Sequence, residues 1–332
     1  MIVLGLPRRA SPDIFRTCEQ NRADSQMTGA LRAGVAGAGV FGGHHARKYA
    51  SLPGVALAAV LDPDRERAET LAEPLGGRAF DRIDAFLDAV DIVTVATPAS
   101  SHSGIALAAL AAGKHVYVEK PLTDDPTTAA ALVRAAALAG RVLACGHQER
   151  AVFAAMGLLA APERPLRLEA VRRGTFTGRN GDVSCVLDLM IHDIDLALAL
   201  DPSPANVASA SGTAPIGPFI DEARAALLFE DGMAVVLEAS RCAKARERTM
   251  RIVYPSGEVE IDFLTRAFHN TTPFALDAGF AETAEGRDPL GASVSAFVAA
   301  VRGEAPRPLV TGEEAARALD VALAVDRAAA HF

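Results

Sequence analysis

The chain has 332 residues, a formal net charge of −8 and 50% hydrophobic residues, enough for two domains of ordinary size with substantial cores. No apolar run approaches the ~20 residues of a membrane span, and the negative charge argues against a general nucleic-acid or anionic-membrane surface. The cysteines are scattered and form no CxxC pair, so we expect neither a disulfide framework nor a zinc site, and a reducing cytoplasm is the simplest setting. They are Cys18, Cys145, Cys185 and Cys242.

The first residues differ from the rest. A short apolar start is followed by polar sequence, with no apolar signal-peptide core and no clear cleavage site. We expect residues 1–29 to form a disordered N-terminal extension, or to precede a natural start near Met27. The folded protein is expected to begin near Ala30.

Residues 30–147 alternate between strand and helix patterns. Strands separated by helices of 10–15 residues indicate βαβ units and a parallel sheet, and we predict a first domain of the Rossmann dinucleotide-binding type over this range. The predicted strands are 31–39, 55–62, 89–98, 114–121 and 141–147, and the predicted helices are 42–52, 63–75, 101–113 and 127–140.

The pattern changes after residue 147. Alternating or apolar runs separated by the turn signals FEDG (229–232) and PSGE (255–258) predict an α+β domain over 148–310 with a large, mainly antiparallel open sheet. Thr311 and Glu314 have the spacing of a capping box. They open a C-terminal helix over 311–332, which we expect to pack back on the first domain.

The first strand runs into the sequence Gly37-Ala38-Gly39-Val40-Phe41-Gly42, a GxGxxG motif at the start of a βαβ unit. In this context the glycines allow a tight turn and a close approach of backbone to a pyrophosphate at the helix N-terminus. Asp62 ends the second strand, where an acid accepts hydrogen bonds from ribose hydroxyls and favours NAD over NADP. Arg65 lies close enough in the sequence to leave NADP as the alternative cofactor. Asp62 could also simply be an acidic residue at the N-terminus of the following helix.

Two further strands end in chemically useful residues, Thr97-Pro98 and Glu119-Lys120-Pro121. The carboxyl ends of parallel strands border the ligand crevice of an open α/β sheet. A lysine biased to an extended conformation by the following proline is well placed as a fixed donor. An ordinary surface lysine is the alternative.

Residues 184–200 are apolar on nearly every side, yet contain Asp188, His192 and Asp195. At about 100° per helical residue these three lie within roughly 60° of one another, and Asp193 faces the other side. A buried ionisable stripe lines a cleft, pairs with other groups or binds a ligand. The alternative is a structural network of satisfied hydrogen bonds.

Together, GAGVFG, ATPASSH (96–102), AGKHVYVEKPL (112–122) and DLMIHDIDL (188–196) resemble the glucose–fructose oxidoreductase / inositol dehydrogenase / MocA family across residues 30–330. The resemblance implies an NAD(P)-dependent oxidoreductase that moves a hydride between a sugar or polyol ring hydroxyl and nicotinamide.

Within that family, Lys120 and His192 would be the acid/base pair at the substrate hydroxyl, Asp188 would assist them and Asp195 would line the substrate pocket. Asp188 lies one turn from His192 and can orient its ring. The nicotinamide half of the cofactor site would be lined by Thr97, Pro98, His102 and Glu119.

A narrower resemblance concerns GHQER (146–150) and RNGDV (179–183), which are similar to the branch acting on nucleotide sugars, in particular the UDP-N-acetylglucosamine 3-dehydrogenases. A locally basic pocket would suit a diphosphate, and surface arginines are the alternative reading. The arginines concerned are Arg150, Arg172, Arg173, Arg179 and Arg241.

We therefore predict a cytoplasmic dehydrogenase acting on a nucleotide sugar, with a free sugar or inositol as the alternative substrate and a non-catalytic dinucleotide-binding regulator as the alternative of another class. We expect no metal, nucleic-acid or membrane partner. The second sheet looks too apolar on both faces for one layer of helices, for example in LLFEDGMAVVLEA (227–239), which predicts a homodimer or homotetramer built through it.

Overall fold

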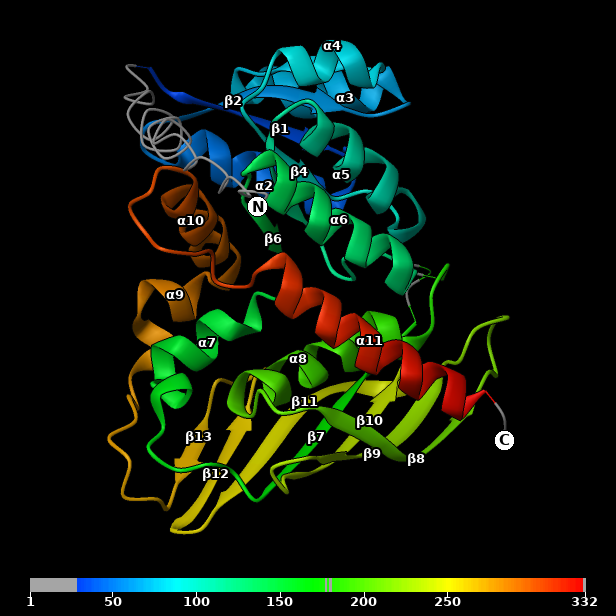
Figure 1. Cartoon of the computed structure of the whole chain (residues 1–332), viewed down its shortest axis with the longest axis vertical. Helices are drawn as coiled ribbons and strands as arrows, with labels where there is room; N and C mark the ends of the chain where they lie inside the picture. The colour runs from blue at the N-terminus through cyan, green and yellow to red at the C-terminus, as the bar shows by residue number, and fades with distance from the viewer. Residues whose placement is uncertain (1–28, 177, 179–180, 331–332) are drawn as a thin grey trace, which may run out of the picture.

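The computed structural model describes residues 29–176, 178 and 181–330, so the extension predicted over residues 1–29 lies outside the described residues except for Gly29. Two sheets form the framework (Figure 1). The first lies at the top of the figure among helices, and the second forms the base.

The first sheet has six parallel strands in the order β3-β2-β1-β4-β5-β6, the doubly wound arrangement of a Rossmann fold. Its strands are β1 (Leu31–Ala36), β2 (Val55–Leu61), β3 (Arg78–Phe80), β4 (Ile92–Val95), β5 (His115–Val118) and β6 (Leu143–Cys145). Its helices are α2 (Val40–Ser51), α3 (Arg65–Ala72), α4 (Ile83–Asp88), α5 (His102–Ala111) and α6 (Pro126–Ala139).

The sequence reading missed one strand and one helix of this sheet. The strand β3 has three residues at the sheet edge, and α4 has six. Neither element is long enough to show a hydrophobic period, so the sequence between the predicted helix 63–75 and the predicted strand 89–98 was interpreted as a loop.

The second sheet has seven strands in the order β13-β12-β11-β7-β10-β9-β8, and only β10 and β7 pair in parallel. The predicted fold class, a Rossmann domain followed by a mainly antiparallel open sheet, is confirmed. The strands are β7 (Arg167–Thr175), β8 (Ala205–Thr213), β9 (Glu222–Phe229), β10 (Ala234–Ser240), β11 (Cys242–Tyr254), β12 (Gly257–Asp262) and β13 (Phe268–Asn270). The helices of this half are α7 (Glu149–Met156), α8 (Ile191–Leu200), α9 (Ala284–Arg287), α10 (Pro289–Val301) and α11 (Gly312–Ala329).

One face of the second sheet is covered by helices and the other is not. In β9 the odd-numbered residues from Ala223 to Phe229 are buried, whereas Glu222, Arg224 and Leu228 are exposed. The helices α8 and α11 lie over the buried face (Figure 1). Among the described residues no helix covers the opposite face.

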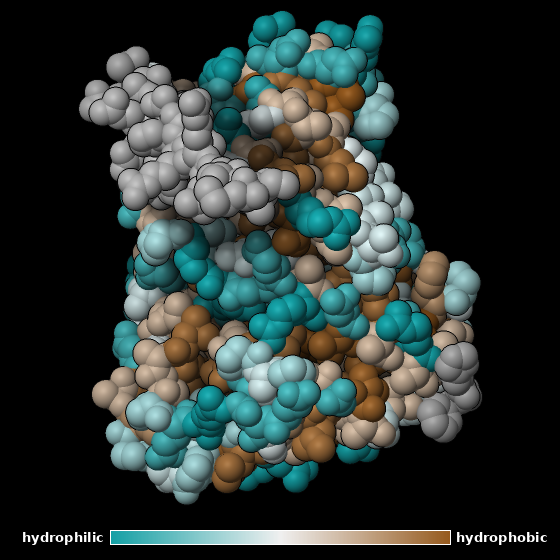
Figure 2. Space-filling view, viewed as in Figure 1, coloured by the Kyte–Doolittle hydropathy of each residue, from teal (hydrophilic) through white to brown (hydrophobic). Residues whose placement is uncertain are grey.

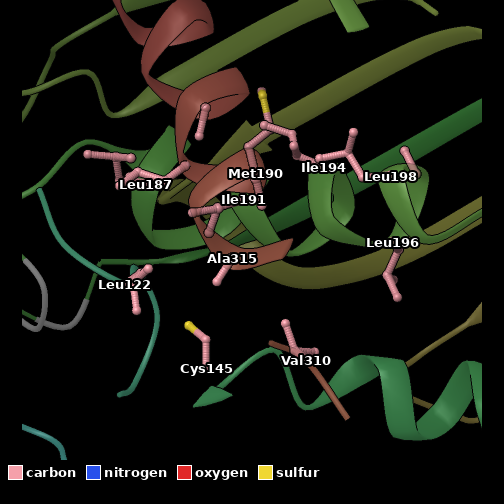
Figure 3. Close-up of a cluster of buried hydrophobic side chains, with 14 of the residues drawn as sticks. Leu122, Cys145, Leu187, Met190, Ile191, Ile194, Leu196, Leu198, Val310 and Ala315 are labelled. Atoms are coloured by element: carbon pink, nitrogen blue, oxygen red, sulfur yellow. The ribbon is translucent and has the colours of Figure 1, made fainter. Parts of the chain in front are cut away.

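The segment predicted as one helix over 184–200 is two elements. A π-helical turn, η4 (Val186–Met190), precedes α8, and the turn contains Asp188. Because i→i+5 bonds replace i→i+4 bonds in this turn, its side chains do not keep the α-helical spacing relative to α8. The apolar side chains of both elements point into a core shared with α11 and β6 (Figure 3).

Helices α10 and α11 connect the two halves. Val294, Phe297 and Val298 of α10 pack in the apolar cluster of the first sheet. Helix α11 begins with the predicted capping box of Thr311 and Glu314, and contacts α6 as well as α8 and β8. Both helices therefore contact elements of the two halves and hold them together.

On the face seen in Figure 2, hydrophobic residues lie in several small areas interspersed with hydrophilic ones. In the described part of the chain, no helix is long and apolar enough to cross a bilayer.

Candidate active site

The glycine turn after β1 is fixed by close backbone contacts. Gly37 has a φ of +98°, and a Cβ on it would lie 2.6 Å from the carbonyl oxygen of Ala96. A Cβ on Gly42 would lie 1.7 Å from the carbonyl oxygen of Gly37, so helix α2 can approach the strand only with glycine there. A Cβ on Gly39 would meet no atom within 4 Å.

The N-terminus of α2 has the electrostatic properties of an anion site. Its cap residue Gly39 provides no side-chain hydrogen bond, and the first turn contains no acidic residue. The first backbone N–H groups of a helix lack intrahelical partners and carry partial positive charge. A pyrophosphate fits this donor set.

A cavity of about 860 Å³ lies over the turn and the ends of β1, β4 and β5. It is lined by all the predicted cofactor residues except Gly42, which lies behind the turn. These residues are Gly37, Gly39, Val40, Phe41, Asp62, Thr97, Pro98, His102, Glu119 and Lys120.

Asp62 is 5% exposed and its carboxylate is held by three donors. It accepts hydrogen bonds from the Ala38 and Asp64 N–H groups (2.8 and 2.9 Å) and from the Arg67 guanidinium (2.7 Å). Burial alone would raise the pKa of Asp62, but these donors outweigh it and lower the pKa. Arg65 pairs instead with Glu69, so the arginine at this carboxylate is Arg67, which the sequence reading did not identify.

His102 joins two loops that line the cavity. Its Nδ1 lies 2.8 Å from the carbonyl oxygen of Pro121 and its Nε2 lies 2.9 Å from that of Thr97. Burial lowers the pKa of His102. The side chain thereby fixes the ends of β4 and β5 relative to each other.

Glu119 forms a buried hydrogen-bonded group beneath Lys120. Its Oε1 lies 2.7 Å from Nε2 of His45 and accepts a hydrogen bond from the Gln148 amide (2.9 Å). Burial would raise the pKa of Glu119, and His45 and Lys120 outweigh that effect, so the pKa is lowered. Glu119 is thus an ionised carboxylate held by His45 and Gln148 next to Lys120.

Lys120 and Asp188 lie where the cavity meets a second pocket. The ammonium group of Lys120 donates to the carbonyl oxygen of Asp188 (2.6 Å) and to its Oδ1 (3.0 Å). Both residues line both spaces. The structure thus brings together residues that are 68 positions apart in the chain.

The second pocket has a volume of about 460 Å³ and includes His192. The Nδ1 atom of His192 is buried and has no hydrogen-bond partner among the described residues. Burial, followed by the positive charges of Lys120, Arg172 and Arg248, lowers the pKa of His192 well below its usual value. The ring is therefore neutral near pH 7 and able to accept a proton.

Arg150 and Asp195, which were predicted to bind substrate, lie outside both spaces. Arg150 donates to both oxygens of the Asp195 carboxylate (2.8 and 2.7 Å), and Nη1 of Arg150 lies 3.0 Å from Glu314 on α11. Both side chains are buried and line neither space. Asp188 and His192 line the second pocket together, whereas Asp195 is paired with Arg150 outside it.

Arg172 lines the second pocket, but its guanidinium is paired with carboxylates of the protein. It is buried, donates to both oxygens of Asp193 (3.0 and 2.7 Å) and donates to both oxygens of Glu149 (2.7 and 2.6 Å). Its positive charge is therefore neutralised by two carboxylates of the protein, although part of the side chain lines the pocket.

The pocket is nevertheless basic, and its lining includes Arg173 and Arg241. Arg241 donates to Asp221 (2.6 Å) and lies over the ring of Phe176 (5.1 Å to the centroid). Two further arginines, Arg246 and Arg248, also line the pocket. Arg179, the remaining predicted member, lies outside the described residues.

The sequence reading did not select Gln148, Glu149, Arg246 or Arg248 as individual residues. The first two follow β6, whose carboxyl end borders the same crevice as those of β4 and β5, and this position could have identified them. The two arginines lie on β11 in a strongly charged stretch, where the sequence does not separate pocket residues from surface ones.

The structure therefore joins a dinucleotide-type cavity to a basic pocket, with a lysine where they meet and a neutral histidine in the basic pocket. This combination is typical of a nicotinamide-dependent oxidoreductase. In the described part of the chain, no group of His, Cys, Asp and Glu side chains could hold a metal ion.

Comparison with known proteins agrees with this class. Residues 31–147 match the oxidoreductase family with an NAD-binding Rossmann fold, and residues 165–260 match the GFO/IDH/MocA C-terminal domain. The chain is 39% identical to UDP-N-acetylglucosamine 3-dehydrogenase of Acidithiobacillus ferrooxidans over 72% of its length and 76% of that protein. The solved structure of that enzyme aligns with a TM-score of 0.82 and 36% identity over 90% of this chain and 97% of the other.

Two further relatives differ in their named roles. GenD2 from gentamicin A biosynthesis, solved in complex with NAD, aligns with a TM-score of 0.77 and 26% identity over 92% of this chain and 96% of the other. The scyllo-inositol 2-dehydrogenase of Bacillus subtilis is 30% identical over 64% of this chain and 67% of that protein.

The chain belongs to the GFO/IDH/MocA oxidoreductase family. It is an NAD-dependent dehydrogenase, as the sequence predicted, and the alternative of a non-catalytic regulator is not supported. The glycine turn, the uncapped helix N-terminus and the cavity over them fit NAD.

Proposed function

We propose that the enzyme oxidises a ring hydroxyl of a nucleotide sugar, with UDP-N-acetylglucosamine oxidised at C3 as the substrate. The observation that carries this proposal is the basic pocket that opens directly from Lys120 and His192. The named activity of the Acidithiobacillus ferrooxidans relative supports the choice of sugar.

NAD, when bound, supplies the hydride acceptor. We assign the pyrophosphate to the N-terminus of α2 and the adenine-ribose hydroxyls to Asp62. Asp62 places a negative group where the extra phosphate of NADP would lie, and Arg67 pairs with it. We therefore expect NAD to be preferred and NADP to bind more weakly.

The residues between the two spaces supply the acid–base chemistry. We assign His192 as the base that takes the hydroxyl proton and Lys120 as the cation that steadies the oxygen as its charge develops. Asp188 holds the Lys120 ammonium in place through the 3.0 Å contact.

The arginines of the pocket suit a diphosphate. Among the described residues Arg246 has no carboxylate partner, and Arg248 lies 3.8 Å from Glu149. Arg173 is held by Glu238 and Glu247, neither of which lines this pocket. We propose that Arg246 and Arg248 face the diphosphate, with Arg241 supporting the wall through Phe176.

Ligand-dependent thermal stability and NADH formation test the proposal. UDP-N-acetylglucosamine is expected to raise the melting temperature and to yield NADH from NAD, and UDP alone is expected to raise it without turnover. Myo-inositol is expected to do neither. Turnover of myo-inositol without any response to UDP would replace this proposal with the alternative of an inositol dehydrogenase.

We also propose a homo-oligomer formed through the uncovered face of the second sheet. Partly exposed Val171, Val236 and Ala226 lie on this face, surrounded by charged pairs such as Arg251 and Glu258. Light scattering is expected to give a dimer or tetramer, and a monomer of about the 34.5 kDa chain mass would contradict this.

The domain boundaries and the cytoplasmic location are proposals of the same kind. We propose a cofactor domain over 30–147, a substrate and assembly domain over 148–310, and a C-terminal helix that joins them. The described cysteines are free thiols, which suits a reducing compartment.

A further inference from the structure

Glu149 is the carboxylate that lies beside the buried side of the His192 ring. Its Oε2 is 3.8 Å from Nδ1 of His192. Both side chains are mostly buried, with 16% and 17% of their surfaces exposed. Glu149 opens α7 directly after the end of β6, whereas His192 lies on α8.

Arg172 fixes Glu149 in this position. The two nitrogens Nη1 and Nη2 donate to the two oxygens of Glu149 at 2.7 and 2.6 Å, a bidentate geometry that allows little rotation. The same guanidinium donates to both oxygens of Asp193, the neighbour of His192 in the chain. The cluster thus ties β7, α7 and α8 together around His192.

The remaining charges around His192 are mostly positive. Lys120 approaches from the loop after β5, Arg172 from β7 and Arg248 from β11, and all of them disfavour a protonated ring. His147, after β6, packs edge-on at 6.2 Å between ring centroids. Asp188 lines the same pocket from η4, with its Oδ1 3.0 Å from the Lys120 ammonium.

We propose that Glu149 is a positioning residue for His192. It selects the tautomer that carries hydrogen on Nδ1, which leaves the Nε2 lone pair available to the pocket, and it stabilises the imidazolium formed when Nε2 is protonated. This inference rests on the proposed function, in which His192 is the base. Catalytic hydrogen bonds are often longer without substrate, which accommodates the 3.8 Å separation.

The proton balance is simple. The substrate O–H bond breaks and its proton forms a bond to Nε2 of His192, while the carbon–oxygen bond becomes a carbonyl and the hydride leaves to NAD. The histidine then carries one positive charge next to Lys120 and Arg248. A fixed anion near Nδ1 offsets this charge, and the Glu149 carboxylate lies 3.8 Å from that atom.

The first test is independent of turnover. Nitrogen-15 NMR of histidine-labelled enzyme, with His192 assigned by comparison with His192→Gln, is expected to show hydrogen on Nδ1 of the neutral ring. Hydrogen on Nε2 would overturn the proposal. Absence of activity with UDP-N-acetylglucosamine would contradict the proposed substrate and leave this NMR result to decide the role of Glu149.

The second test uses matched variants. Glu149→Gln removes the charge with little change in shape, so we expect the acid limb of the kcat/KM profile to move down by about one pH unit and kcat to fall roughly 10-fold. Asp193→Asn loosens the same Arg172 cluster without removing the carboxylate at Nδ1. It is expected to lower stability and leave the acid limb in place.

Equal movement of the acid limb in both variants would reduce Glu149 to a structural role and overturn the proposal. If Glu149→Gln does not fold, Glu149→Asp serves instead. Aspartate keeps the negative charge on a shorter side chain. The acid limb of the kcat/KM profile is therefore expected to move by less than the one pH unit expected on removal of the charge.

Discussion

Asp188 and Asp195 come from one short helical segment, and each pairs with a distant cation, yet the structure places them in different settings. Asp188 contacts Lys120 at the boundary between two ligand-sized spaces. Asp195 contacts Arg150 in a buried pair that reaches neither. The comparison teaches that an ionisable residue in an apolar helix marks a site only when its paired group also faces a cavity.

The largest effect is expected at the cation paired with Asp188. Lys120→Ala removes the group assigned to steady the developing negative charge, so kcat/KM is expected to fall by about 10³-fold, with little change in melting temperature. Steady-state kinetics and thermal unfolding measure the two effects. Lys114→Ala, which removes a lysine outside both spaces, is the control, and activity within a few-fold of wild type in Lys120→Ala would contradict the assignment.

The cation paired with Asp195 should behave in the opposite way. Arg150→Ala leaves a buried carboxylate without its main partner, and we expect it to lower the free energy of unfolding by about 3–5 kcal/mol. Denaturant titration measures this loss. The double variant Arg150→Met/Asp195→Leu removes both charges and should recover most of the stability, whereas an equal loss in both variants would mean that the pairing itself is not the cause.

Asp62 is a third buried carboxylate, and it tests whether burial or contact with a cavity decides the role of such a residue. Asp62 is as buried as Arg150, but it lines the cofactor space. Asp62→Asn is expected to raise the Kd for NAD about 10-fold, because it weakens charge-assisted hydrogen bonds to the ribose. Asp64→Ala removes the N-cap of α3 instead, and calorimetry should show an unchanged Kd for NAD. Equal Kd values for NAD in the two variants would contradict the assignment of Asp62 to the ribose.

The smallest effect is expected at an arginine without a carboxylate partner among the described residues. Arg246→Ala should raise KM for the nucleotide sugar about 3-fold, since a solvent-accessible charge contributes less than about 1 kcal/mol. The effect should diminish at high salt. Lys244→Ala, on the same strand but outside the pocket, is the control, and an equal change in KM there would point to general surface charge.

The sequence by itself determined the Rossmann half, the glycine turn and the strand-end residues Thr97 and Lys120. These are local features, since a glycine is required where backbones touch and the ends of parallel strands meet at one edge. Alternation likewise predicted the second sheet, although its edge strand β13, like β3 in the first sheet, was too short to show a period.

Only the tertiary structure decided how the charges pair. The π-helical turn breaks the regular spacing on which the stripe of Asp188, His192 and Asp195 was based. Arg150 and Arg172 come from other elements and neutralise the carboxylates that they meet, so neither is free for a ligand. Pairing depends on distances between segments far apart in the chain. This is why residue type and spacing could select candidate site residues but not the partner of each charge.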